Sequence, residues 1–255
     1  MSPLPSEEKR VAFVTGASYG LGAASAIALA REGFDVAVSE LRVEDLSDTL
    51  DKIAATGRKA APVHLDVRSM ASVEKAMADV VAAFGRVDVL VNNAGVTVRR
   101  FALEVTPEEW DEVINVNLKG TFFMSQQLGR QLVQSHRTGC IINIASAHGV
   151  LGFAQRTTYG ISKAGIIHMT RMLAYEWADH GIRVNAVAPG TVETKTRAEY
   201  FNAFPQARQA MMDRIPVHRF GTPEEVGAAV SYLASPAAAY ITGQTLLLDG
   251  GLTSY

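Results

Sequence analysis

The chain has 255 residues, of which 48% are hydrophobic and 20% charged, with a formal net charge of −2. This length suits one large α/β domain, and the absence of a basic cluster argues against nucleic-acid or anionic-membrane partners. The single cysteine, Cys140, excludes an internal disulfide and favours a reducing cytoplasm. No apolar run approaches the ~20 residues of a membrane span. Residues 1–9 lack the apolar core of a signal peptide, so we expect a disordered lead-in.

Strand and helix patterns alternate along the rest of the chain. Apolar runs typical of buried strands lie at residues 10–15, 35–39, 60–65, 87–91, 139–145, 182–188 and 244–248. Helical patterns lie at residues 23–32, 43–56, 69–84, 106–136, 156–180 and 222–234. Continuously apolar strands separated by helices predict a parallel sheet covered on both faces. Because no linker divides residues 10–255, we expect a single doubly wound, Rossmann-type α/β domain of about seven strands.

Residues 190–221 interrupt this alternation. The segment is polar and carries Arg197, Arg208, Arg214 and Arg219. A long irregular insertion after the carboxyl end of a strand is a typical place for a substrate lid. The alternative is that the segment is a solvent-exposed surface loop and not a lid.

The first predicted strand runs directly into a glycine-rich turn and then into a helix. The turn contains Gly16, Ser18, Tyr19, Gly20, Leu21 and Gly22. Glycine lets the backbone approach a pyrophosphate, and the helix N-terminus offers free N–H groups and a positive dipole end. The spacing Gly-x-x-x-Gly-x-Gly differs from the general dinucleotide fingerprint, so the prediction depends on the strand–turn–helix context.

Glu40 follows the second predicted strand. A carboxylate there accepts hydrogen bonds from the adenosine ribose hydroxyls and repels a 2′-phosphate, which favours NAD over NADP. Tyr19 occupies a position where an arginine would have helped to bind that phosphate. Arg42 would weaken the exclusion by pairing with a phosphate, so NADP remains an alternative.

Polar and small residues end the next two strands. Asp66, followed by Val67, is placed to bind the adenine amino group or, alternatively, to cap the next helix. Asn93, Ala94 and Gly95 follow the fourth strand, where small residues let the backbone pass close to a cofactor. An ordinary Asn-rich turn is the competing interpretation.

Tyr159 and Lys163 lie one helical turn apart, and Ser146 ends the preceding apolar strand. A phenol has an unperturbed pKa of about 10, and we expect the Lys163 ammonium to lower it toward neutral pH. Ser146 is placed to bind a substrate oxygen. The three side chains suit proton exchange at an alcohol or carbonyl oxygen while a hydride moves, although a surface Tyr–Lys pair would share the spacing.

These motifs, in this order, resemble the short-chain dehydrogenase/reductase family over essentially the whole chain. They are TGASYGLG at 15–22, Asp66, NNAG at 92–95, Asn117, Ser146, Tyr159 with Lys163, PGTVET at 189–194, and TGQTLLLDGG at 242–251. The resemblance implies a Rossmann fold that assembles as a homotetramer, or as a homodimer, and an NAD(P)-dependent enzyme. Ala145 and Leu21 depart mildly from the family pattern.

The resemblance also implies a role for each matching residue. Tyr159 would be the general acid/base, and Lys163 would lower its pKa and hold the nicotinamide ribose. Ser146 would polarise the substrate oxygen, and Asn117 would fix a water in the proton relay. The remaining matches would meet the nicotinamide carboxamide or shape its loop: Pro189, Gly190, Val192 and Thr194.

The substrate is open at this point. The resemblance includes enzymes of sugars, polyols and sugar acids as well as 3-oxoacyl carrier-protein reductases, and the arginines of residues 190–221 hint at an anion. A nucleotide-sensing protein without turnover is a further alternative, which the intact Asn117, Ser146, Tyr159 and Lys163 set disfavours. His148 either lines the pocket or has no role. The histidines show no metal-ligand spacing, so we expect no metal site.

Overall fold

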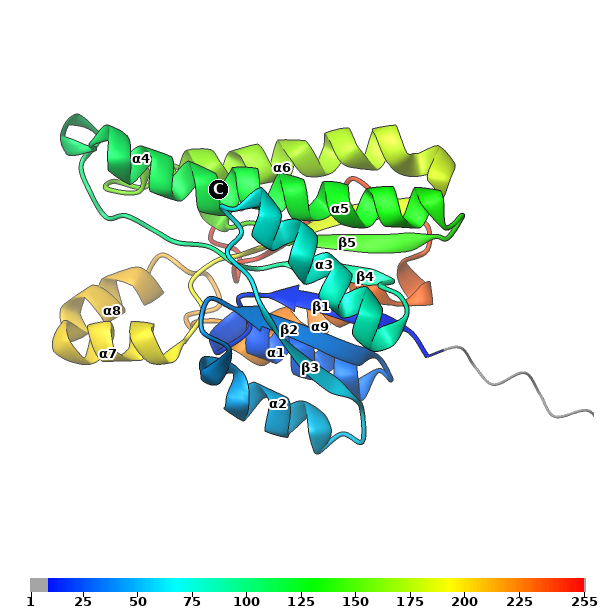
Figure 1. The fold of residues 1–255 in the computed structure, drawn as a ribbon. Coiled ribbons are helices and arrows are strands. Elements are labelled where there is room, and N and C mark those ends of the chain that lie inside the picture. The colour runs from blue at the N-terminus through cyan, green and yellow to red at the C-terminus, as the bar shows by residue number, and fades with distance from the viewer. Residues whose placement is uncertain (1–8, 255) are drawn as a thin grey trace, which may run out of the picture.

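The computed structural model describes residues 9–254, apart from the side chains of residues 196 and 200. The lead-in expected at residues 1–9 therefore lies almost wholly outside the described residues. Seven parallel strands form one sheet in the order β3-β2-β1-β4-β5-β6-β7 (Figure 1). They are β1 Val11–Thr15, β2 Asp35–Glu40, β3 Ala60–His64, β4 Val89–Asn92, β5 Gly139–Ile144, β6 Ile182–Pro189 and β7 Thr245–Leu248. The sheet confirms the predicted Rossmann-type fold, with strand ends within two residues of those expected.

Helices cover both faces of the sheet (Figure 1). One layer comprises α1 Gly20–Arg31, α2 Ser47–Ala54 and α9 Pro223–Ala234, and the other comprises α3 Met70–Phe84, α5 Thr121–Gln134 and α6 Thr157–Trp177. Leu29 and Phe34 are fully buried on the first face, and Phe13 and Leu128 on the second. Each such side chain contributes about 1.5–3 kcal/mol of transfer free energy. The two cores hold the carboxyl ends of the strands in place.

The expected helix at 106–136 has an unexpected middle. Thr106 caps α4 Pro107–Ile114 through a complete capping box with Glu109, as the sequence predicts. A π-helical segment, Asn115–Gly120, then separates α4 from α5. A Cβ at Gly120 would lie 2.8 Å from the Val67 Cβ, so glycine is needed for this close packing. The wider turn leaves Asn117 fully buried, and such turns are common at functional sites.

The segment expected to be irregular contains two helices, α7 Lys195–Ala203 and α8 Pro205–Met212. They project beyond the carboxyl ends of the strands (Figure 1). The segment is ordered because it has its own apolar cluster, in which Phe201, Ile215, Phe220 and Leu252 are buried. Its two ends are joined where residues 192 and 221 form a parallel bridge.

The expected helix at 43–56 begins instead as a 3-10 turn, Val43–Leu46, before α2. Within residues 9–254, no helix combines the length and the apolar character needed to cross a bilayer.

Candidate active site

The glycine-rich turn and the loop after β4 pack directly against each other. Gly16 has a φ of +63°, and a Cβ there would lie 2.9 Å from the Ala94 Cα. A Cβ at Gly22 would meet the Gly16 carbonyl oxygen and lie 2.5 Å from Asn93 Nδ2. Side chains at these two glycines would therefore push the two loops apart. The close approach forms a cradle of bare backbone beside the N-terminus of α1, as a pyrophosphate requires.

Thr15, which the sequence analysis did not single out, links these two loops. Its Oγ1 accepts hydrogen bonds from the N–H groups of Asn93 (3.0 Å) and Ala94 (3.1 Å). Asn93 Nδ2 donates in return to the carbonyls of Thr15 (3.0 Å) and Gly16 (2.7 Å). A hydroxyl at the last position of the first strand was the signal that could have identified it. The Asn93 loop is thus fixed against the glycine-rich turn.

Glu40 is held at the carboxyl end of β2. Ser18 Oγ donates to one carboxylate oxygen at 2.7 Å, and the Leu41 N–H donates to the other at 3.0 Å. Arg42 instead forms a two-pronged pair with Asp45, at 3.0 and 2.7 Å. The arginine that would soften phosphate exclusion is therefore engaged away from Glu40.

The other residues predicted to bind the cofactor lie either in the glycine-rich turn or at and after the carboxyl end of β6. Tyr19 is exposed, and the Thr194 methyl lies 3.7 Å from the Cβ position of Gly20, so these two candidate segments meet. Leu21 packs against the core, and Val192 is buried in it. Pro189 ends β6, and the next residue, Gly190, donates its N–H to the Leu248 carbonyl at 2.9 Å.

Asp66 makes a tight local pair. Its carboxylate accepts from Arg68 Nε at 2.9 Å and Nη2 at 2.8 Å, and Arg68 holds the pKa of this carboxyl below its usual range. Ser69, not Asp66, caps α3, so the helix-cap alternative is wrong. Val67 lies against Gly120 of the π-helical segment.

Ser146, Tyr159 and Lys163 come together as expected. Ser146 is 8% exposed at the end of β5, and it lies close enough to the Tyr159 hydroxyl to lower the pKa of that phenol. Lys163 is 4% exposed. Its Nζ donates to the Ile144 carbonyl at 2.7 Å and lies 5.6 Å from the centre of the Tyr159 ring.

The expected pKa shift of Tyr159 is wrong for this arrangement. Burial raises the pKa of the phenol, against the opposing effects of the neighbouring Ser146 hydroxyl and of the charges of Arg156 and Arg197. Burial also lowers the pKa of Lys163 to about 8. Desolvation disfavours the charged form of both groups. Tyr159 is consequently neutral at pH 7, and Lys163 loses its proton at a lower pH than an exposed lysine does.

Asn117 connects the nucleotide side of the site to the helix of Tyr159. Its Oδ1 accepts from the Val96 N–H at 2.8 Å, and its Nδ2 donates to the Val96 carbonyl and to Ser162 Oγ at 2.9 and 3.0 Å. Ser162 Oγ donates in turn to the Tyr159 carbonyl at 2.7 Å. Ser162 was missed, although a hydroxyl three residues after Tyr159 faces the same side of a helix.

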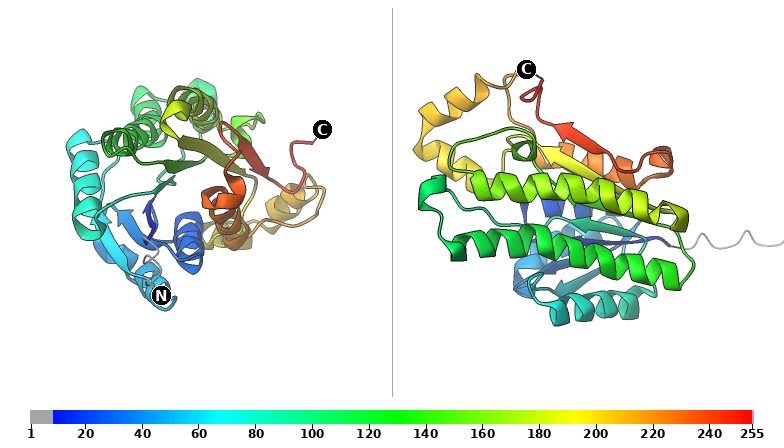
Figure 2. Two further views of the ribbon diagram at one scale, coloured as in Figure 1. Left: turned by 90° about the vertical axis from the view of Figure 1, so that its right-hand side faces the viewer. Right: turned by 90° about the horizontal axis from the view of Figure 1, so that it is seen from above.

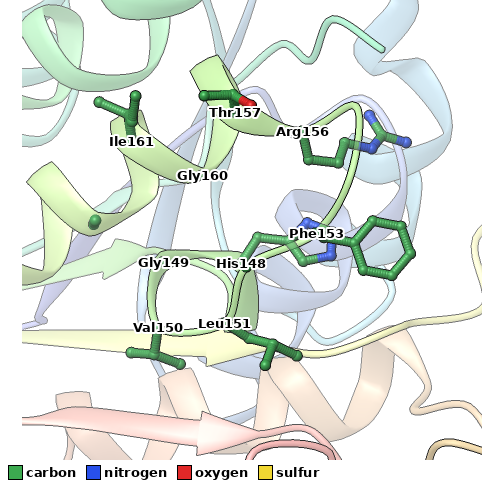
Figure 3. Close-up of a pocket in the computed structure, with 11 residues that line it drawn as sticks. His148, Gly149, Val150, Leu151, Phe153, Arg156, Thr157, Gly160 and Ile161 are labelled. Carbon is green, nitrogen blue, oxygen red and sulfur yellow. The ribbon is translucent and has the colours of Figure 1, made fainter. Parts of the chain in front are cut away.

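A pocket of about 310 Å³ lies between residues 148–153 and the first turns of α6. His148 lines it: its ring stacks on Phe153 at 5.2 Å and meets the Tyr159 ring edge-on at 5.9 Å. Figure 3 shows the His148 and Phe153 rings next to each other, with Arg156 on the same side of the pocket. His148 therefore lines a pocket together with Phe153 and Arg156, which the sequence analysis did not single out, and a contact of His148 with substrate stays a prediction.

We expect His148 to make the protein less stable as the pH falls from 6.5 to 4. Burial and the charges of Arg156, Arg197 and Arg214 lower its pKa from 6.5 to about 4. Within this window the unfolded chain binds a proton that the folded protein does not, so the free energy of unfolding falls with pH. In urea unfolding at pH 7, 6, 5 and 4.5, His148→Phe should show a shallower decline than wild type. Identical declines would contradict the shifted pKa.

The fold, the bare-backbone cradle and the Ser–Tyr–Lys group together define a dinucleotide-dependent oxidoreductase. Comparison with known proteins agrees. Residues 16–253 match a family model described as enoyl-(acyl-carrier-protein) reductase. The chain is 40% identical over 245 residues to a Thermotoga maritima 3-oxoacyl-(acyl-carrier-protein) reductase, covering 96% of this chain and 98% of that protein. It is 38% identical over 244 residues to the Escherichia coli 2-dehydro-3-deoxy-D-gluconate 5-dehydrogenase, covering 96% and 95%.

A solved structure from Agrobacterium tumefaciens gives the same result. It is described as a 2-deoxy-D-gluconate 3-dehydrogenase with bound NADP, and it superposes with a TM-score of 0.90 at 38% identity over 98% of each chain. The chain belongs to the short-chain dehydrogenase/reductase family. It is an NAD(P)-dependent oxidoreductase that acts on CH–OH and keto groups.

Proposed function

We propose that this enzyme interconverts a secondary alcohol and a ketone on a sugar, polyol or sugar acid, with NAD as its preferred cofactor. The observation that carries the proposal is the convergence of Ser146, Tyr159 and the buried Lys163 at the carboxyl end of β5. NAD(P), when bound, supplies or accepts the hydride. The sugar-acid assignment draws support from the Escherichia coli relative described above.

The residues that would hold the nucleotide fit it chemically, because two glycines leave a cradle that a Cβ would fill. We assign nucleotide binding to Gly16, Ser18, Tyr19, Gly20, Leu21, Gly22, Glu40, Asp66, Val67, Asn93, Ala94, Gly95, Pro189, Gly190, Val192 and Thr194. Glu40 would hold ribose hydroxyls, and Lys163, whose Nζ lies 3.7 Å from the Cβ position of Gly95, would hold the second ribose.

Tyr159 would move the proton. In the reducing direction its hydroxyl donates a proton to the substrate oxygen, and in oxidation its phenolate accepts one. Ser146 would bind the same oxygen and polarise it. Asn117 would hold the loop that contains Val96 against the helix of Tyr159, and it would fix a water of the relay. A positive charge at Lys163 would stabilise the phenolate and offset part of the desolvation that raises the pKa of Tyr159.

Replacing Glu40 should shift the nucleotide preference. Glu40→Gln removes the charge that would repel a 2′-phosphate, so we expect kcat/KM for NADP relative to NAD to rise about tenfold, a change of about 1.4 kcal/mol. Glu44→Gln makes the same charge change at an exposed position nearby and should leave the ratio unchanged. A tenfold preference of the wild type for NADP would refute the NAD assignment.

A panel of nicotinamide absorbance assays at 340 nm tests the function. Polyols, sugar acids and β-ketoacyl thioesters would each be supplied with NAD or NADP in the matching redox state. The Thermotoga maritima relative supports 3-oxoacyl reduction as the second candidate, and turnover confined to the thioesters would establish it. Tight nucleotide binding without turnover on any compound would instead establish a nucleotide sensor.

We further propose that the protein works as a homotetramer, or as a homodimer, in the cytoplasm. α5 and α6 lie side by side along one surface (Figure 2). They expose Phe122, Ile161, Met172 and Tyr175, the last at 91%. Apolar side chains gathered on two neighbouring helices are typical of an interface. Light scattering after size exclusion would give the number of subunits.

We also propose that residues 10–255 fold as one unit and that residues 190–221 form a substrate lid. The position of α7 and α8 beyond the carboxyl ends of the strands supports this assignment.

A further inference from the structure

A chain of buried polar side chains crosses the core between the sheet and the helices α5 and α6. Asn92, at the end of β4, donates through Nδ2 to Ser125 Oγ on α5 and to Asn143 Oδ1 on β5, both at 2.9 Å. Asn143 Nδ2 donates in turn to Thr170 Oγ1 on α6 at 2.9 Å. None of these four side chains is more than 4% exposed, so the protein itself supplies their hydrogen-bond partners.

The Asn143 amide is paired at both ends. Its oxygen accepts from Asn92 and its nitrogen donates to Thr170, so the amide cannot turn without breaking a buried hydrogen bond. A fully paired polar network makes the surrounding core rigid. An apolar contact here would let the helix slide along the sheet, whereas a hydrogen bond keeps its two atoms within a narrow range of distances.

The hydrogen bond between Asn143 and Thr170, which we call the Asn143–Thr170 bridge, lies beside the contact that holds Lys163. Asn143 is followed on β5 by Ile144, whose carbonyl accepts from Lys163 Nζ at 2.7 Å. Thr170 comes two helical turns after Lys163 on α6. Both contacts therefore join the carboxyl end of β5 to the same helix.

The position of the Lys163 ammonium depends on that strand end. Among the described residues, the Ile144 carbonyl is the one hydrogen-bond acceptor of Nζ. The lysine side chain is 4% exposed, and Nζ lies 5.6 Å from the centre of the Tyr159 ring. A shift of β5 along α6 would move the carbonyl, and the ammonium would follow it relative to the phenol.

We propose that Asn143 and Thr170 are positioning residues of this oxidoreductase, because their hydrogen bond fixes the end of β5 against α6 and so keeps the Lys163 ammonium beside Tyr159. They would act through Lys163 and not by contact with the substrate. The inference rests on the roles that the proposed function gives to Lys163 and Tyr159. A misplacement of about 1 Å can lower the rate of an enzyme about 10²-fold, so the bridge should affect turnover as well as stability.

Thr170→Val tests the bridge with the smallest change, since it removes the hydroxyl and keeps the shape of the side chain. Absorbance at 340 nm would give kcat for D-gluconate with NAD and for acetoacetyl-CoA with NADH. We expect Thr170→Val to lower kcat tenfold or more, and Thr170→Ser, which keeps the hydroxyl, to stay within twofold of wild type. A kcat of Thr170→Val within twofold of wild type would overturn the proposal.

Asn143→Ala and Asn185→Ala form a matched pair that separates positioning from loss of stability. Asn185 lies on the neighbouring strand β6 and, like Asn143, is 0% exposed. Its side chain also makes two hydrogen bonds, to the Ile241 carbonyl at 2.8 Å and from the Gln244 N–H at 3.0 Å. Urea unfolding should show similar destabilisation of both variants, while only Asn143→Ala should lower kcat tenfold. Equal losses of kcat would show that the Asn143 network only stabilises the core.

Crystal structures test the placement of Lys163 without turnover. The distance from Nζ to the Ile144 carbonyl is 2.7 Å. It should exceed the roughly 3.2 Å limit of an N–H···O hydrogen bond in Thr170→Val, and stay below that limit in Thr170→Ser and Asn185→Ala. An unchanged distance in Thr170→Val would overturn the proposal even if kcat falls. If the wild type turns over no compound of the panel, the proposed function fails, and this distance alone decides whether the bridge positions Lys163.

Discussion

Tyr159→Phe should lower kcat by about 10³-fold while leaving the fold and nucleotide binding intact. The substitution removes only the hydroxyl that exchanges the proton, and general acid–base catalysis typically contributes 10²–10⁴-fold. The ring that meets His148 at 5.9 Å stays in place. Absorbance at 340 nm gives the turnover, and quenching of protein fluorescence by nucleotide gives the affinity.

The control is Tyr240→Phe, the same chemical change at a fully exposed side chain that belongs neither to the active site nor to the proposed subunit interface. It should keep full activity. If Tyr159→Phe retains more than a few per cent of wild-type kcat, another group moves the proton and the role given to Tyr159 is wrong.

Of all these variants, Gly22→Ala should lower the free energy of unfolding most, and it should also weaken nucleotide binding. The added Cβ would meet the Gly16 carbonyl and lie 2.5 Å from Asn93 Nδ2, so the two loops of the cradle must separate. Overpacking of this kind costs about 1–3 kcal/mol, and separation of the loops disrupts the surface that faces the pyrophosphate. Urea unfolding and a nucleotide titration measure the two effects.

Gly152→Ala provides the comparison, because a Cβ there meets no atom within 4 Å. It should be neutral or stabilise by up to about 1 kcal/mol through the unfolded state. Equal destabilisation by both variants would show that the loss comes from helix or loop propensity and not from the cradle.

The sheet could be predicted because its signals are local. Continuous apolar runs such as those of β1 and β5 are strands that are buried throughout or at all but the first residue, and the Thr-Pro-Glu-Glu sequences gave the capping boxes at Thr106 and Thr222. Ser146, Tyr159 and Lys163 were predicted to meet because a strand end and a helical turn determine their positions. Each of these predictions depends only on residues that are close together in the sequence.

The errors concern interactions between distant residues. The π-helical turn at Asn117 is followed by the close approach of Gly120 to Val67, a contact between distant parts of the chain that no local pattern reveals. The helices α7 and α8 are short and polar and are held by an apolar cluster that includes Leu252, far along the chain. The sign of the Tyr159 pKa shift was wrong because burial, not spacing, sets it.

The two ends of residues 192–221 are joined to each other, and this has a consequence for how the substrate specificity could change. Two backbone hydrogen bonds, from the Glu193 N–H to the Gly221 carbonyl at 2.8 Å and from the Gly221 N–H to the Thr191 carbonyl at 3.0 Å, fasten the neck of the insertion. The chain between these two hydrogen bonds is therefore attached to the rest of the fold at a fixed point. On the proposed lid role, exchange of the segment between these two hydrogen bonds would change the substrate range and leave the nucleotide half of the fold unaltered.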